Sequence, residues 1–168
     1  MRNKNNYSGM LVLLIGTIVI GNLNAQTDNR LNGSWVQITE GVEFELRLRN
    51  GNFEELYNGI SFRRGTFTTN IREITIVPTH IHGDGFKLIM GDTENVLGLE
   101  SKWYTFNEFI ITMRASLLRL GLSERDANEF VESALTGDTT STYSVDGNTL
   151  ILMSTLQEQK HSIILTRR

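Results

Sequence analysis

The stretch Val42-Glu43-Phe44-Glu45-Leu46-Arg47-Leu48-Arg49-Asn50-Gly51 decides the fold class. Apolar and charged residues alternate through it, and a period of two is typical of a strand with one dry face and one wet face. Asn50-Gly51 follows at once, and Asn-Gly is the preferred pair for a two-residue type I′ hairpin. The stretch therefore predicts an antiparallel hairpin whose dry face carries Val42, Phe44, Leu46 and Leu48.

Seven further segments have strand character. They are residues 33–39, 53–58, 61–69, 71–81, 137–145, 150–156 and 161–167. Turn pairs such as Glu40-Gly41, Asn58-Gly59 and Asp146-Gly147 separate several of them. Eight short strands with tight turns predict a mainly β fold, an eight-stranded up-and-down antiparallel barrel that closes on itself and leaves no exposed edge. A two-sheet sandwich is the alternative.

Two residues interrupt the strand pattern. Gly65 lies inside a strand, where glycine often marks a bend or a close backbone approach. Pro78 cannot donate a ladder hydrogen bond, so its strand is expected to lie at an edge or to carry a bulge there. In a regular strand Ile74 and Ile76 would share an apolar face with His80 and His82, whereas a bulge would turn the residues beyond it to the other face.

Between the fifth and sixth strands the apolar spacing becomes helical. Thr105 and Glu108 form a capping box at the start of a helix that ends near Gly121, and Ser123 with Asp126 caps a second helix. The short connection predicts a helical hairpin over about residues 105–135, buried against the open end or outer wall of the barrel as a lid. Residues 82–103, which are rich in glycine, are expected to form a loop.

The N-terminal segment has the pattern of a secretory signal peptide. Arg2 and Lys4 precede an apolar run over residues 10–21, and Ala25 supplies a small residue at the exit. Cleavage after Ala25 would leave residues 26–168 as the mature domain, exported to a periplasm or the extracellular space. An uncleaved signal anchor is the alternative, but a spanning helix needs roughly 20 apolar residues. No stable membrane anchor is expected after cleavage.

The composition and the lack of known catalytic motifs argue against several classes of function. The chain has 168 residues, which suits one domain, and a formal net charge of −3 without a Lys/Arg stripe, so no nucleic-acid partner is expected. Cysteine is absent, which excludes disulfides, thiolate metal sites and catalytic thiols. No nucleophile elbow, phosphate-binding loop or dinucleotide fingerprint occurs, so the sequence predicts neither an enzyme nor a cofactor.

Several motifs give the sequence a family resemblance. They are Leu31-Asn32-Gly33-Ser34-Trp35, Arg64-Gly65-Thr66-Phe67-Thr68, the run from Thr142 to Leu150, and Leu165-Thr166-Arg167. With them the chain resembles the lipocalin-like domains of bacterial secreted proteins, which are calycin-type barrels, over about residues 31–80 and 138–167. The resemblance implies that Trp35 closes the barrel floor and that Arg167 or Arg168 packs over it, by guanidinium stacking on the indole. It also implies a barrel that can hold a small apolar ligand.

His80-Ile81-His82 is a candidate metal site. Histidines two residues apart on a strand point the same way, so both imidazoles can reach one zinc or other transition metal. Asp84 or His161 could supply a third ligand. The alternative is a strand end whose histidines are solvated or bonded to backbone, and a structural zinc site needs more ligands than this pair provides.

Two other groups have alternative interpretations. Trp103 and Tyr104 precede the helix and could line a pocket mouth, although large aromatics more often anchor packing. The acidic pairs Glu54-Glu55 and Glu43/Glu45 are expected on a solvated outer face rather than in acid/base catalysis.

The sequence predicts an exported, non-enzymatic binding protein. A small apolar ligand would lie in the barrel against Phe44, Leu46, Ile74 and Ile76, with Trp103 and Tyr104 at its mouth. One alternative is an envelope protein–protein interaction or inhibitor module with a filled barrel and an apolar patch on the insert. The other is a metal-binding protein that uses His80 and His82.

Overall fold

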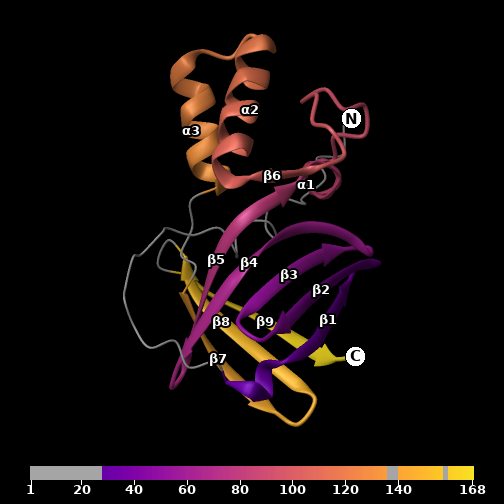
Figure 1. Cartoon of the computed structure of the whole chain (residues 1–168), viewed down its shortest axis with the longest axis vertical. Coiled ribbons are helices and arrows are strands. Elements are labelled where there is room, and N and C mark those ends of the chain that lie inside the picture. Colours follow the sequence, from indigo (N-terminus) through magenta and orange to yellow (C-terminus); the bar gives the residue numbers. More distant parts are fainter. Residues whose placement is uncertain (1–27, 136–139, 157–158) are drawn as a thin grey trace.

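The computed structural model describes residues 28–135, 140–156 and 159–168. Eight antiparallel strands form a closed up-and-down barrel, in which each strand pairs with its neighbour along the chain and the first strand pairs with the last (Figure 1). The predicted barrel is thereby confirmed and the sandwich is excluded, while the predicted signal peptide lies outside the described residues. The strands are β1 Gly33–Thr39, β2 Val42–Arg49, β3 Asn52–Tyr57, β4 Ile60–Asn70, β5 Glu73–His82, β7 Thr140–Asp146, β8 Thr149–Leu156 and β9 Gln159–Arg167.

The first hairpins follow the turn chemistry of the sequence. Asn50 and Gly51 have φ values of 49° and 76°, and Asn58 and Gly59 have 49° and 77°. Two successive positive φ values are the type I′ geometry, whose twist matches that of the flanking strands. These turns fix the register that places Phe44, Leu46 and Leu48 inside the barrel, where each is at most 2% exposed.

A bulge interrupts the β4–β5 ladder near Pro78. Gly65 pairs with Pro78 but Arg64 pairs with His80, so Thr79 is the extra residue on β5. A Cβ on Gly65 would lie 2.0 Å from the carbonyl oxygen of Val77, which explains why glycine is needed at this crossing. Because of this one extra residue, the side chains of β5 beyond the bulge point to the opposite face from the one they would occupy in a regular strand.

The lower end of the barrel is closed by a 3-10 helix, η3 (Asn29–Leu31), and by Trp35. The indole N–H of Trp35 donates to the carbonyl of Leu31 at 2.7 Å, and both side chains are fully buried. The guanidinium carbon of Arg167 lies 4.5 Å from the centre of the Trp35 ring. Of the two arginines that the resemblance suggested, Arg167 is therefore the one stacked on Trp35.

A helix that the sequence did not predict covers the upper end. Residues 82–103 were expected to be a loop, but α1 spans Gly83–Met90 and the short strand β6 begins at Trp103. The sequence did not predict this helix because it contains Gly83 and Gly85, and glycine lowers helix propensity. They are required by packing, since a Cβ on Gly83 would lie 2.0 Å from the oxygen of Glu100 and one on Gly85 would lie 2.2 Å from the oxygen of Ser61.

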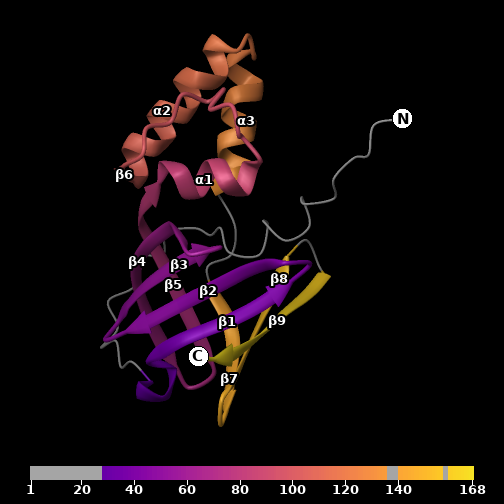
Figure 2. The same cartoon turned by 90° about the vertical axis from the view of Figure 1, so that its right-hand side faces the viewer.

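The predicted helical hairpin stands on top of α1. It consists of α2 (Phe106–Arg119) and α3 (Glu124–Leu135), and it follows β6 (Trp103–Thr105), which pairs with the end of β5. Both bonds of the predicted Thr105–Glu108 capping box are present. Figure 2 shows α1 lying between the barrel and the α2–α3 pair, so α1, rather than the hairpin, is the direct cover of the barrel. No helix in the described part of the chain is long and apolar enough to span a membrane.

The apolar core has two parts, which we call the barrel cluster and the cap cluster. The barrel cluster includes Leu46, Phe67, Ile74, Ile76 and Leu165. The cap cluster joins β4 and β5 to the helices through Phe62, Ile81, Phe86, Phe109 and Met113. Tyr57 packs against both clusters.

One seam of the barrel is short. β1 and β9 pair at Trp35–Arg167 and Val36–Thr166, whereas β1 and β2 pair along the whole of β1. The backbone N–H of Arg168 donates to the carbonyl of Ser34 at 2.9 Å and extends this contact.

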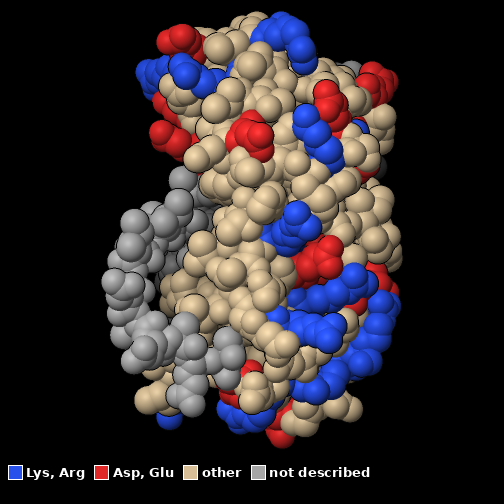
Figure 3. Space-filling model, in the orientation of Figure 1, with Lys and Arg blue, Asp and Glu red and all other residues tan. Residues whose placement is uncertain are grey.

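Charged side chains cover the outer wall beside the seam. The Arg168 guanidinium reaches across β1 to Glu43 at 2.8 Å and Glu45 at 3.3 Å, and Arg47 binds Glu45 at 3.0 Å. Burial alone would raise the pKa of Glu45, but the hydrogen bond from Arg47 holds it below its usual value. In Figure 3 lysine and arginine side chains gather over the barrel wall where β1 and β2 lie in Figure 1.

Candidate functional site: a buried ion pair between the two clusters

The most unusual group in the interior is the ion pair between Glu55 and Arg63. Both side chains are almost fully buried, with Glu55 0% and Arg63 2% exposed. Charged residues are rarely buried this deeply unless they are paired. The pair lies in the barrel between the barrel cluster and the cap cluster.

Strand alternation places Glu55 inside. On β3 it lies two residues from Phe53 and two from Tyr57, and it pairs across the ladder with Leu46 of β2. Because side chains alternate along a strand and paired residues share a face, Glu55 must point inward with Phe53 and Leu46. Its other cross-strand partner is Arg63 of β4.

A second bulge brings Arg63 to the same face. Glu55 pairs with Arg63 but Leu56 pairs with Ser61, so Phe62 is the extra residue. Phe62 consequently joins the cap cluster, while Arg63 turns into the barrel beside Glu55. One inserted residue thus supplies both an aromatic anchor for the cap and the cation of the pair.

The pair has the bidentate geometry that arginine favours with carboxylates. Arg63 Nε donates to Glu55 Oε2, and Nη2 donates to Oε1 at 2.9 Å. Two parallel charge-assisted hydrogen bonds fix both side chains and make the pair stronger than a single contact would. The guanidinium carbon also lies 5.6 Å from the centre of the Phe62 ring.

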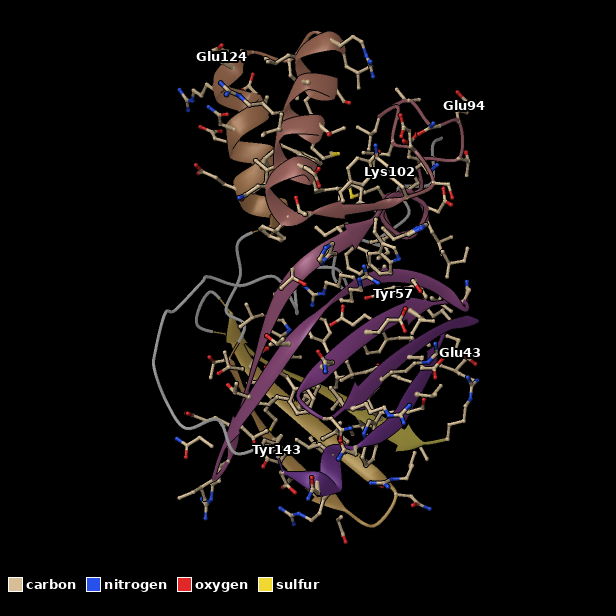
Figure 4. The ribbon with its side chains drawn as sticks, viewed as in Figure 1. Glu43, Tyr57, Glu94, Lys102, Glu124 and Tyr143 are labelled. Carbon is tan, nitrogen blue, oxygen red and sulfur yellow. The ribbon has the colours of Figure 1, made fainter. Side chains whose placement is uncertain are left out.

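Tyr57 adds a hydroxyl to this region. Its ring is 5.2 Å from Phe44 and 5.7 Å from Phe62, centre to centre, so it links the two clusters. Figure 4 shows Tyr57 near the upper end of the barrel. Burial, and then the Glu55 carboxylate, raise the pKa of the Tyr57 hydroxyl far above its usual value, so this group stays neutral well above physiological pH.

The residues predicted to bind a ligand divide between different places. Phe44, Leu46, Ile74 and Ile76 all lie in the barrel cluster, and Leu46 directly opposes Glu55. Tyr104 belongs to the cap cluster, where its ring lies 6.0 Å from Phe109. Trp103 lies on the opposite face of β6 and does not join either cluster.

Trp103 instead packs with residues on the outer side of the bulge. The Arg64 guanidinium carbon lies 4.3 Å from its ring centre, and the His82 ring meets it edge-on at 5.1 Å. These contacts attach β6 to the barrel wall, as the packing alternative proposed. Trp103 and Tyr104 therefore lie in different surroundings, and a pocket mouth formed by them stays a prediction.

The two histidines of the predicted metal site have separate environments. His80 Nδ1 is 2.9 Å from the hydroxyl of Thr79, while His82 packs against Trp103. Asp84, one of the two candidates for a third ligand, is held by Lys87 at 2.8 Å and by the hydroxyl of Ser101. Among the residues that the structure describes, no three metal-binding side chains come together. Metal binding by His80 and His82 stays a prediction.

Glu55 and Arg63 were missed at the level of sequence. Glu54 and Glu55 were both expected on the solvated face, but adjacent strand residues point to opposite sides. The expectation holds for Glu54, which faces outward to the hydroxyl of Ser61 at 2.7 Å, and is wrong for Glu55. The sequence does contain a signal for Glu55, because Phe53, two residues earlier on the same strand, is apolar and points inward. It contains no signal for the bulge that turns Arg63 inward.

Comparison with known proteins adds no assignment. No protein-family model, no curated protein and no solved structure matches this chain. The lipocalin-like resemblance therefore stays a prediction, although the barrel that it implied is present.

Proposed function

We propose that the chain is an exported, non-enzymatic binding protein whose barrel holds a small apolar ligand. The observation that carries this proposal is the buried Glu55–Arg63 ion pair inside a barrel whose buried lining is mostly apolar. Small-molecule sites are concave and mostly apolar, with a few placed polar groups that fix orientation. The interior of this barrel has that chemical composition.

The free-energy cost of burying the two charges supports a functional role for the pair. Removing two charges from water is expensive, and well-packed apolar residues of similar volume often give equal or greater stability. Each end of the barrel is already closed by other means, with Trp35 below and α1 above. Ligand recognition would explain why a buried ion pair is present, whereas the stability of the fold does not require one.

Native mass spectrometry of the protein purified gently from its source tests the proposal. We expect a retained organic mass of a few hundred daltons, as for a ligand of the size such sites hold. Leu46→Phe, which adds volume beside Glu55, should reduce the retained fraction. Ile38→Phe is the matched control, because Ile38 is 69% exposed on the neighbouring strand β1. A bare protein to which no apolar compound can be added back contradicts the proposal.

The outer face of α2 favours a second candidate, an envelope protein–protein interaction module. Ile111, Ala115 and Leu118 are exposed at helical spacing on the side away from the buried residues Phe109 and Met113. Exposed apolar stripes of this kind mark interaction surfaces. In this case Ile111→Lys should abolish binding of a partner recovered with the wild type, whereas Asn128→Lys on the exposed face of α3 should not.

A further inference from the structure

We infer that the barrel selects a ligand whose polar end is uncharged and rejects carboxylates and amines at the Glu55–Arg63 pair. The inference rests on the proposed binding function and names the chemical class of its ligand. An apolar chain ending in an alcohol, ester or ketone oxygen has the chemistry that fits.

The charge balance of the pair excludes ionised end groups. Glu55 already neutralises Arg63 through two hydrogen bonds. A ligand carboxylate beside them would leave one uncompensated negative charge in an apolar interior, and an ammonium would leave one positive charge. An uncompensated buried charge is strongly unfavourable, because the interior cannot replace its hydration.

The remaining hydrogen-bonding capacity of the pair suits a neutral oxygen. A guanidinium carries five N–H donors and Glu55 takes two of them, through Nε and Nη2. The Tyr57 hydroxyl, which burial keeps protonated, can donate or accept in the same region. A hydroxyl or carbonyl oxygen can accept from these donors without adding charge.

The surroundings of the pair place the rest of the ligand. Leu46 lies beside Glu55 on β2, Phe53 lies two residues away from it on β3, and Phe44 lies opposite Tyr57; all three apolar residues belong to the barrel cluster. A hydrocarbon chain would therefore extend downward among apolar side chains, with its polar end at Arg63 and Tyr57. The cap cluster lies above the pair, and Glu55 and Arg63 are at most 2% exposed, so an end group bound beside them would be shielded from bulk water and its charge would be costly to bury.

Competition between matched probes tests this selectivity. Dodecanol, dodecanoate and dodecylammonium would each be titrated against the neutral dye Nile red bound to the wild-type protein, at a pH where both ionisable probes are charged. We expect dodecanol to bind at least about tenfold more tightly than either charged probe. Equal affinity, or a preference of the wild type for a charged probe, overturns the inference.

Removing the Glu55 charge should invert the preference. In Glu55→Gln the Arg63 charge is no longer neutralised, so the affinity of dodecanoate should rise by more than the wild-type gap between the two probes, and dodecanoate should bind more tightly than dodecanol. Glu54→Gln is the matched control: it makes the same chemical change one residue away on the outer face and should leave the order of the probes unchanged. An unchanged order in a folded Glu55→Gln protein counts against the inference.

A variant that lacks both charges separates an effect on ligand selectivity from an effect on folding. Glu55→Gln leaves Arg63 buried without its partner and could destabilise the barrel, whereas Glu55→Gln/Arg63→Met removes both charges together. This double variant should still prefer dodecanol over dodecanoate, and the wild-type order is measured independently of any variant. If Nile red and all three probes fail to bind the wild type, the binding function fails and the inference with it. If they bind without selectivity, only the inference fails.

Discussion

At the scale of single residues, the lower end of the barrel depends on Asp28. Its carboxylate accepts from Arg30 at 2.7 Å and from the hydroxyl of Tyr143 at 3.0 Å, and its backbone N–H donates to Thr69 at 2.9 Å. The hydrogen bond from the Arg30 side chain is the main reason that the pKa of Asp28 falls to about 2. Through these contacts the segment before β1 is attached to β4 and β7.

We therefore expect Asp28→Asn to lower stability at neutral pH by about 1 kcal/mol. Because the folded pKa is below the usual one, the contribution of Asp28 is complete above about pH 4 and is lost as pH falls towards about 2. The difference between wild type and variant in urea unfolding should shrink over that window. Glu94→Gln, a change at an exposed carboxylate, should give no such pH-dependent difference.

Tyr57 gives a prediction with the opposite sign. Because its folded pKa is raised, it favours the folded state below the usual tyrosine value of about 10 and loses this contribution as pH rises towards the folded value. Absorbance titration of wild type and Tyr57→Phe should show equal phenolate signals in the folded proteins near pH 11. In denaturant the wild type should show one tyrosine more. A difference of one phenolate in the folded state would mean that the Tyr57 hydroxyl ionises there near its usual pKa.

At the scale of elements, α1 shows how packing overrides propensity. Gly83 and Gly85 weaken a short helix, yet this helix fits because both glycines lie directly against backbone oxygens. Phe86 then enters the cap cluster and meets Phe109 at 4.7 Å between ring centres. The element exists because of tertiary contacts that no local pattern encodes.

Gly85→Ala tests this explanation. Alanine is the better helix former, but its Cβ would lie 2.2 Å from the Ser61 oxygen, so α1 must move away from β4. We expect a loss of at least about 2 kcal/mol in the free energy of unfolding. Gly91→Ala is the control, since its φ of 68° is strained for alanine but its Cβ meets nothing within 4 Å, and it should cost about 1 kcal/mol. Equal losses in the two variants would argue against steric exclusion.

The elements also show how far the sequence could predict the fold. Strands with strict alternation and Asn-Gly turns were located well, because both signals are local. The α2–α3 hairpin was likewise predicted from its capping residues Thr105 and Ser123. What could not be predicted depends on contacts across the barrel, namely the bulge at Phe62, the inward turn of Arg63 and the existence of α1. The candidate site lies in that second group, which is why sequence pointed to its apolar neighbour Leu46 but not to the pair itself.

At the scale of the whole molecule, the barrel closes between strands that are far apart in the chain. Trp35 pairs with Arg167, whereas the β1–β2–β3 pairings join residues that are close in sequence. Contacts between distant residues require closure of a long loop before they stabilise the chain. The β1–β9 seam is therefore expected to form late in folding.

Folding kinetics of two core variants test this order of events. Leu165→Ala and Leu46→Ala each truncate a fully buried side chain of the barrel cluster and should each cost about 3 kcal/mol. Leu165 lies on β9 next to Thr166 and Arg167, the two residues that pair with β1, so its truncation should mainly accelerate unfolding, with a φ-value near zero. Leu46 lies on β2 among local hairpins, so its truncation should slow folding. The reverse pattern would place closure of the seam before formation of the hairpins.

The same seam brings the two ends of the described chain together. The Arg167 guanidinium donates to the backbone carbonyl of Arg30 at 2.6 Å, and Arg168 donates to Ser34 beside it. A short peptide could therefore join these ends, and the chain could be opened instead at the exposed Asn50-Gly51 turn. Such a circular permutant would keep every neighbour around the barrel while β3 became the first strand. The arrangement of strands in space is thus separable from their order along the chain.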